Sequence, residues 1–268
     1  MIKHICSFSS GLSSAIATDR VLSRFGSDNI DIIFEDTLFE DDDNYRFLRD
    51  CENRWNKKII VLCEGFNPYE IAEKKQLIPN SRMAPCTFQL KINPFKKYLE
   101  KNYEWGIIYI GYDFTELERC GDTEAAYNKI GYGVDFPLLW KPYENRTYSK
   151  VVREDWGIEP PRMYEMNFTH ANCGGRCVKQ GKSDWLRLLR NFPDRYKQIE
   201  NWEQWMRTNP KYSKYTILKI VKKEIVRKIT LRELREEYES QMECMPDLFD
   251  DTDSPCVVCG VGSICDID

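Results

Sequence analysis

Histidine is scarce in this sequence of 268 residues, which contains only His4 and His170. Chemistry that uses histidine as a general acid or base therefore has little material. Long apolar runs are missing as well, since none approaches the roughly 18 residues that a membrane span needs. The formal net charge is only −4, which gives no global attraction for nucleic acids or anionic lipids. The sequence thus predicts no membrane partner, and any contact with a polyanion has to be local.

The composition is that of a globular protein, with 42% hydrophobic and 13% aromatic residues. No internal repeat or low-complexity tract is present. The segment 1–4 leads directly into a strand-like stretch without a signal-peptide pattern, so a cytoplasmic location is expected. The composition is compatible with a monomer or an oligomer.

The first half alternates short apolar runs with amphipathic stretches, the pattern of an α/β protein. It predicts an open, mostly parallel twisted sheet with flanking helices over residues 1–148, followed by a helical region over 149–243 and a flexible, cysteine-containing tail over 244–268. The expected strands are 3–8, 31–34, 58–63 and 105–112, and the expected helices are 12–24, 41–54, 90–102, 149–156, 178–190, 193–207 and 231–243. Ligands of such sheets bind beyond the carboxyl ends of the strands.

A serine-rich turn, Cys6-Ser-Phe-Ser-Ser-Gly-Leu-Ser-Ser-Ala15, joins the first predicted strand to the first predicted helix. Small residues let the backbone approach an anion, hydroxyls donate to phosphate oxygens, and the helix N-terminus adds free N–H groups. The same turn is also compatible with an ordinary helix cap.

Four further segments, together with this turn, resemble the phosphoadenosine phosphosulfate (PAPS) reductase branch of the adenine nucleotide alpha-hydrolase superfamily, which also contains ATP pyrophosphatases. Ser9-Ser-Gly-Leu-Ser-Ser14 is similar to the pyrophosphate loop Ser-Gly-Gly-x-x-Ser. The other segments, in order, are 33–48 with Glu35-Asp-Thr37, Pro85-Cys-Thr-Phe-Gln-Leu-Lys-Ile-Asn-Pro94, Ile110-Gly-Tyr112 with Glu116 and Arg119, and His170-Ala-Asn-Cys-Gly-Gly-Arg-Cys-Val-Lys-Gln-Gly181.

The resemblance implies a fold, a ligand and a set of site residues. It implies that Ser7, Ser9, Ser10, Gly11, Ser13 and Ser14 bind the phosphates of ATP or PAPS, that Glu35, Asp36 and Thr37 lie near the adenosine or a magnesium ion, and that Gly111 lines the pocket. Two residues depart from the family pattern. Ser10 replaces the first loop glycine, and Ser13 stands where ATP pyrophosphatases carry aspartate, which favours the reductase branch or a degenerate site. Asp36 is also compatible with a simple turn role.

The eleven cysteines exceed what a core needs, and clustered thiols in a reducing compartment indicate a metal, an iron-sulfur cluster or thiol chemistry. Relatives with a cluster imply that Cys86, Cys173 and Cys177 are ligands of a [4Fe-4S] cluster or of zinc. A fourth ligand would come from Cys120, His170 or a tail cysteine such as Cys256, while core packing of Cys173 and Cys177 is the alternative. In contrast, Cys6, Cys51 and Cys63 are expected to be small core residues.

The tail carries Cys256, Cys259 and Cys265, with Cys244 just before it. These thiols suit a zinc site, because a Cys-x-x-Cys pair is the usual half of one, or they complete the cluster. PAPS reductases carry a C-terminal catalytic cysteine in Glu-Cys-Gly, and Cys259-Gly260 resembles part of that motif, which makes Cys259 a candidate nucleophile.

The leading hypothesis is an adenine-nucleotide-binding, PAPS reductase-like oxidoreductase or transferase that acts in sulfur transfer or sulfonucleotide chemistry, with a thiol reductant as partner. The alternatives are an ATP-dependent sulfurtransferase that thiolates tRNA or DNA, and a non-catalytic nucleotide or zinc-binding module. The basic stretch 211–235 is a candidate docking surface for the nucleic acid, or simply a solvated face.

Overall fold

The computed structural model describes residues 2–222 and 225–244 of the chain. The chain forms two compact units. The first comprises Met1–Gln76 and Ala84–Cys177, and the second comprises Leu77–Met83 and Val178–Asp268. The sheet and the whole phosphate-loop region therefore belong to the first unit, which extends further than the expected change of pattern at residue 149.

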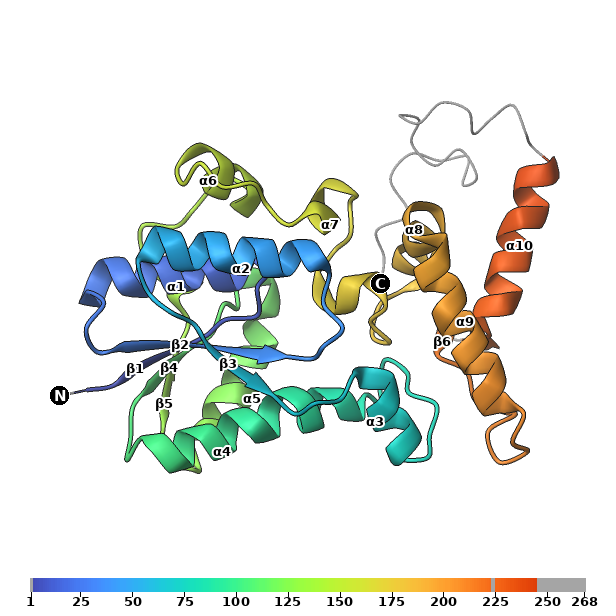
Figure 1. Ribbon diagram of the computed structural model, residues 1–268, viewed down its shortest axis with the longest axis horizontal. Coiled ribbons are helices and arrows are strands. Elements are labelled where there is room, and N and C mark those ends of the chain that lie inside the picture. The colour runs from blue at the N-terminus through green and yellow to red at the C-terminus, as the bar shows by residue number, and fades with distance from the viewer. Residues whose placement is uncertain (1, 223–224, 245–268) are drawn as a thin grey trace. The chain divides into compact units, whose positions relative to one another are not determined.

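A five-stranded parallel sheet organises the first unit, in the order β3-β2-β1-β4-β5 (Figure 1). Cys6 in the central strand is in register with Ile32 on one side and Tyr109 on the other. The strands are β1 (His4–Ser7), β2 (Ile30–Asp36), β3 (Ile60–Cys63), β4 (Ile107–Tyr109) and β5 (Gly133–Asp135). The predicted α/β fold class is confirmed.

The central strands are apolar on both faces because helices cover both faces of the sheet, as Figure 1 shows. On one face, α1 (Leu12–Phe25), α2 (Asp42–Trp55) and α6 (Tyr148–Glu154) pack over a core centred on the buried Phe8. On the other face, α4 (Asn93–Asn102) and α5 (Leu117–Asn128) pack around the fully buried Ile5, Ile33 and Ile108. Cys6 and Cys51 are buried as expected, whereas Cys63 is exposed because β3 is an edge strand.

The first unit also contains two short helices, α3 (Pro68–Lys74) and α7 (Arg162–Glu165), and a π-helical segment, Thr87–Ile92. The expected helix over 90–102 therefore starts earlier and begins in the wider π form. The expected strand over 105–112 is only three residues long, and residues 110–113 after it form an irregular segment.

The second unit is helical, with a small hairpin that the sequence analysis did not predict. Thr230 and Glu233 form a capping box: the Thr230 N–H donates to Glu233 Oε2 at 2.7 Å, and the Glu233 N–H donates to Thr230 Oγ1 at 3.2 Å. The elements are α8 (Lys182–Asn191), α9 (Pro193–Arg207), the antiparallel strands β6 (Leu218–Lys222) and β7 (Ile225–Ile229), and α10 (Leu231–Cys244). Over the described residues, every helix is too short or too polar to cross a bilayer.

Candidate functional site

The predicted phosphate loop lies at the carboxyl end of the central strand. In the sheet, β2 and β3 lie on one side of β1, and β4 and β5 lie on its other side. The order of the strands therefore switches sides between β1 and β4, and ligands of open α/β sheets bind at such a switch point. The loop 8–11 follows β1, and Gly111 follows β4, so both predicted segments lie at the carboxyl ends of the two strands that flank this switch point.

Ser10, which stands where the resembled loop has its first glycine, has a left-handed backbone conformation. Its φ is 56°, in the left-handed region that a side chain disfavours. The residue is fully buried, and its Oγ has no hydrogen-bond partner within the described parts of the chain. The loop therefore keeps the shape that glycine favours, although serine makes that shape more costly.

Ser14 holds the loop together from within. Its Oγ accepts the Ser9 N–H at 3.1 Å and donates to the Gly11 carbonyl at 2.9 Å, while the Ser9 hydroxyl lies 3.1 Å away. The hydroxyl of Ser14 thus shapes the loop, and its contact with a phosphate stays a prediction. Ser7 ends β1, and Ser13 lies in the first turn of α1.

The first turn of α1 provides backbone N–H groups that have no partner inside the helix. Gly11 is its N-cap and supplies no side-chain cap, and no acidic residue lies in the turn. The first amides of a helix have no partner inside the helix and carry partial positive charge. Gly111 allows the β4 end to approach this turn, since a Cβ there would lie 2.8 Å from the backbone of Ser13 and Ser14.

The three predicted residues at the end of β2 have different roles. Asp36 Oδ1 accepts the Leu38 N–H at 2.8 Å and the Tyr45 hydroxyl at 2.7 Å, so this carboxylate holds a turn. The buried Thr37 hydroxyl donates to Glu40 Oε1 at 3.0 Å. Glu35 differs from both because it is buried and its Oε1 is unpartnered in the described structure. Burial raises the pKa of Glu35 to about 8, although nearby Lys91 opposes the shift.

Glu40 and Lys91 form a buried connection that the sequence analysis did not assign, although both lie in the quoted segments. The Glu40 side chain is only 1% exposed, and its Oε1 lies 3.8 Å from the Lys91 Nζ. Its other oxygen accepts the Cys173 N–H at 2.8 Å. Although partial burial of Lys91 lowers its pKa, Glu40 and the nearby acidic groups raise it overall. One carboxylate therefore joins the end of β2, the π-helical segment and the cysteine loop.

The Cys-Gly-Gly loop turns in the left-handed sense. Cys173, Gly174 and Gly175 have φ values of 54°, 55° and 78°, so the two glycines supply a shape that other residues resist. The turn places the Cys173 thiol in a hydrogen bond with Cys177, and this bond together with burial raises the pKa of Cys173 well above its ordinary value. The two thiols are close neighbours, as their sequence spacing predicted.

The predicted convergence of Cys86, Cys173 and Cys177 on one metal is not found. Within residues 2–222 and 225–244, no three Cys, His, Asp or Glu side chains are grouped so that they could hold a metal ion. The metal-binding roles of Cys86, Cys173 and Cys177 therefore stay predictions, which a further ligand from outside the described residues would have to complete. Cys120 lies on α5, where its thiol contacts the Glu116 carbonyl at 3.7 Å, and His170 is exposed. Cys256, Cys259 and Cys265 lie outside the described residues, so their roles stay predictions.

Tyr164, on α7, reaches the phosphate loop from far along the chain. Its hydroxyl accepts the Leu12 N–H at 3.4 Å, and it would lie 3.1 Å from a Cβ at Gly11. The sequence carries no signal for this contact, because α7 is one short turn of helix in an irregular segment.

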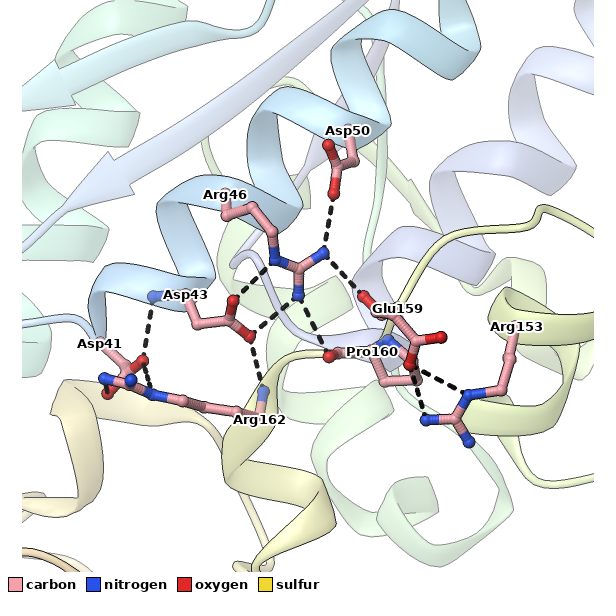
Figure 2. A network of polar contacts seen from close by, with 8 residues as sticks. All are labelled: Asp41, Asp43, Arg46, Asp50, Arg153, Glu159, Pro160 and Arg162. Carbon is pink, nitrogen blue, oxygen red and sulfur yellow. Dashed lines mark hydrogen bonds and ion pairs between the residues drawn. The ribbon is translucent and has the colours of Figure 1, made fainter.

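An ion-pair network fixes the segment that carries Tyr164 (Figure 2). Arg46 on α2 binds Asp43 and Asp50, and also donates to the carbonyls of Glu159 and Pro160 at 2.9 and 3.1 Å. The Arg162 guanidinium pairs at 2.8 Å with Asp41, whose side chain is fully buried, and the Arg162 N–H donates to Asp43 at 2.7 Å. Arg46 holds the pKa of the Asp43 carboxyl below its usual range. The network ties the approach to α7 to the start of α2.

No protein-family model matches the chain. Among curated proteins, the chain is 35% and 33% identical to two uncharacterized proteins of Methanocaldococcus jannaschii, over 75% and 70% of its own length. It spans only 40% and 44% of those relatives.

Among solved structures, the chain is similar to phosphoadenylyl-sulfate (PAPS) reductase from Candida auris in its phosphate complex, with a TM-score of 0.43 and 14% identity over 63% of this chain and 80% of that one. It is also similar to the NH3-dependent NAD synthetase of Campylobacter jejuni, with a TM-score of 0.39 and 12% identity over 80% of this chain and 87% of that one. The first is the kind of protein that the sequence motifs resemble. At TM-scores this low, the likeness carries no information on function.

Proposed function

We propose that this chain is an adenine-nucleotide-binding enzyme of the PAPS reductase-like type, acting in sulfur transfer or sulfonucleotide chemistry. The observation that carries the proposal is the junction of Gly111 with the first turn of α1. It joins a loop with a left-handed turn at Ser10, a helix start whose N-cap Gly11 supplies no side-chain cap, and the switch point of a parallel sheet. Each of these features favours the phosphates of a nucleotide.

The Cys173 and Cys177 thiols are the described sulfur groups that such chemistry could use. The Lys91 ammonium lowers the pKa of Cys173, but the hydrogen bond with Cys177 and burial raise it overall, so Cys173 is held as a neutral thiol. Reduction of the sulfate group of PAPS to sulfite takes two electrons, which two thiols supply as they become a disulfide. We therefore propose a thiol reductant as a further partner, and we keep Cys259 as a candidate nucleophile.

Binding of ATP and PAPS tests the first part of the proposal. Gly11→Val should abolish the binding of both nucleotides, because the added side chain occupies the space between the loop and Tyr164. Gly121→Val is the matched control, since a side chain at the exposed Gly121 on α5 meets nothing within 4 Å. Titration calorimetry on both variants, with circular dichroism as a check of folding, decides the matter. Equal affinity in Gly11→Val and wild type contradicts the proposal.

The β6–β7 hairpin favours a second candidate, an ATP-dependent sulfurtransferase acting on tRNA or DNA. Lys219 and Lys228 are directly opposite each other in the hairpin, and Arg227 follows on the neighbouring pair. Opposed like charges destabilise a hairpin unless an anion lies near them, so the pair favours a phosphate backbone as partner. Lys228 also lies 5.9 Å from the ring centroid of Tyr215, an exposed aromatic suited to base stacking.

Product analysis separates the two candidates. Sulfite release from PAPS in the presence of a dithiol supports the reductase, and pyrophosphate release from ATP that is stimulated by tRNA or DNA supports the sulfurtransferase. Iron and zinc analysis of anaerobically purified protein, together with its visible spectrum, tests whether the cysteines hold a metal. Nucleotide binding without either product indicates a non-catalytic module.

A further inference from the structure

We infer that the Tyr164 hydroxyl is part of the phosphate site and donates a hydrogen bond to a phosphate oxygen held by the loop. The inference rests on the proposed function and names one more residue of that site. Three observations carry it: the position of the hydroxyl, its unused proton, and the rigidity of the segment that presents it.

The position follows from two contacts at the start of α1. The Tyr164 oxygen accepts the Leu12 N–H at 3.4 Å, a long hydrogen bond, and lies 3.1 Å from the Cβ position of Gly11. These are the residues whose backbone the anion would approach. A phosphate at the first turn of α1 would therefore lie within reach of the phenol.

The hydroxyl proton of Tyr164 takes no part in this contact, because the oxygen accepts the hydrogen bond. Within the described residues, the hydrogen bond of this hydroxyl is the accepted one from the Leu12 N–H. A phenol carries one proton to donate, and no group in the described chain receives it. Burial raises the pKa of Tyr164, so the hydroxyl keeps this proton at neutral pH. A phosphate oxygen is a strong acceptor and would receive this proton in a hydrogen bond.

The rigidity comes from ion pairs on both sides of the residue, of which Figure 2 shows those that precede it. Before it, Arg162 is bound to Asp41 and Asp43 at the start of α2. After it, Glu165 accepts a hydrogen bond from Arg153 at 2.9 Å. A donor held in place before the ligand arrives loses little entropy on binding, so its hydrogen bond contributes more fully to affinity.

The test compares Tyr164→Phe with Tyr103→Phe. Tyr103 donates its hydroxyl proton to Asp31 at 2.7 Å, away from the loop, so the control also removes one tyrosine hydroxyl. The probes are ATP, inorganic pyrophosphate and adenosine, titrated into the full chain. A hydrogen bond to a charged group corresponds to about a tenfold to hundredfold change in affinity. We expect a loss of that size for ATP and pyrophosphate in Tyr164→Phe, with adenosine affinity unchanged and Tyr103→Phe equal to wild type.

The other outcomes are decisive as well. Unchanged ATP and pyrophosphate affinity in Tyr164→Phe overturns the inference while leaving the proposed function intact. Tighter binding also overturns it, because the hydroxyl would then compete with the phosphate. An equal loss for adenosine shows a structural role instead. If wild-type protein binds none of the probes, the proposed function fails, and this inference fails with it.

Discussion

Gly111 and Ser14 approach so closely that a side chain on the first would strike the backbone of the second. A Cβ at position 111 lies 2.8 Å from both the N and the Cα of Ser14. Because these are backbone atoms at the start of a helix, no side-chain rotation relieves the contact. The approach fixes the distance between the end of β4 and the phosphate loop.

Gly111→Ala is therefore expected to displace the loop, weaken nucleotide binding at least tenfold and cost about 1–3 kcal/mol of unfolding free energy, the range for overpacked sites. Calorimetry and urea unfolding measure both effects. Gly133→Ala on the adjacent strand is the control, because its Cβ would meet Ile107 Cγ1 at 3.7 Å and the Gly106 carbonyl oxygen at 3.9 Å, both ordinary contacts. Wild-type affinity in Gly111→Ala would show that the loop tolerates the shift.

Ser10→Gly should stabilise the protein. It removes a side chain from a residue with a φ of 56° and eliminates a buried hydroxyl that has no partner in the described structure. The greater freedom of glycine in the unfolded chain offsets part of the gain, so about 1 kcal/mol is expected. Urea unfolding measures it, and Ser10→Ala separates the two causes, since it removes the hydroxyl but keeps a Cβ. A less stable Ser10→Gly would mean that the hydroxyl is bound.

Glu35 should make stability depend on pH. Its pKa is about 8 in the folded protein, against an ordinary value of 4.5. Between these values the folded chain holds a proton that the unfolded chain releases, so the free energy of unfolding falls as the pH rises from 4.5 to 8. Glu35→Gln should remove most of that fall, and the exposed Glu104→Gln should leave it unchanged. Urea midpoints across this pH range provide the test. An equal decline in Glu35→Gln would assign the effect to other groups.

Glu40→Ala should be strongly destabilising. The carboxylate pairs with Lys91 and accepts hydrogen bonds from Thr37 and from the Cys173 amide. Its removal leaves a partly buried cation and an unpaired amide, at an expected cost of about 3–5 kcal/mol. The Cys173 thiol should also react faster with an alkylating reagent, as peptide mass spectrometry can show. Glu40→Gln keeps one acceptor oxygen, so its free energy of unfolding should lie between those of wild type and Glu40→Ala. If Glu40→Ala lowers the free energy of unfolding by less than about 1 kcal/mol, the cysteine loop is held by other contacts.

The sequence predicted the fold where its pattern was long and regular. The helix that begins at Leu12 and the one over 193–207 were placed correctly or nearly so, because apolar periodicity and Pro193 mark them. Strand β5 was missed, since its three residues carry no alternation and owe their conformation to pairing with β4. The β6–β7 hairpin was missed because its lysines and arginines were interpreted only as charge.

The candidate site was predicted in its chain positions and only partly in its contacts. The loop residues could be found because a phosphate loop is local in sequence. Ser14 and Asp36 proved to bind their own backbone neighbours or Tyr45, an alternative that single residues cannot decide. Glu40 acts through Cys173, 133 positions away, and Tyr164 meets Leu12 at a separation of 152. Contacts of that range are set by the packing of whole elements and leave no local pattern.

The short segment Leu77–Met83 belongs to the second unit, although the chain on both sides of it belongs to the first. Ile78 within it is only 2% exposed, so the segment is packed and not a bare connection. No single cut can therefore divide this protein into two self-sufficient pieces. A fragment that ends at residue 177 keeps a stretch whose partners are gone, and one that starts at 178 lacks part of its own unit. During synthesis, these seven residues leave the ribosome before the residues from Val178 onward, so the second unit can form only after the C-terminal part of the chain has been made.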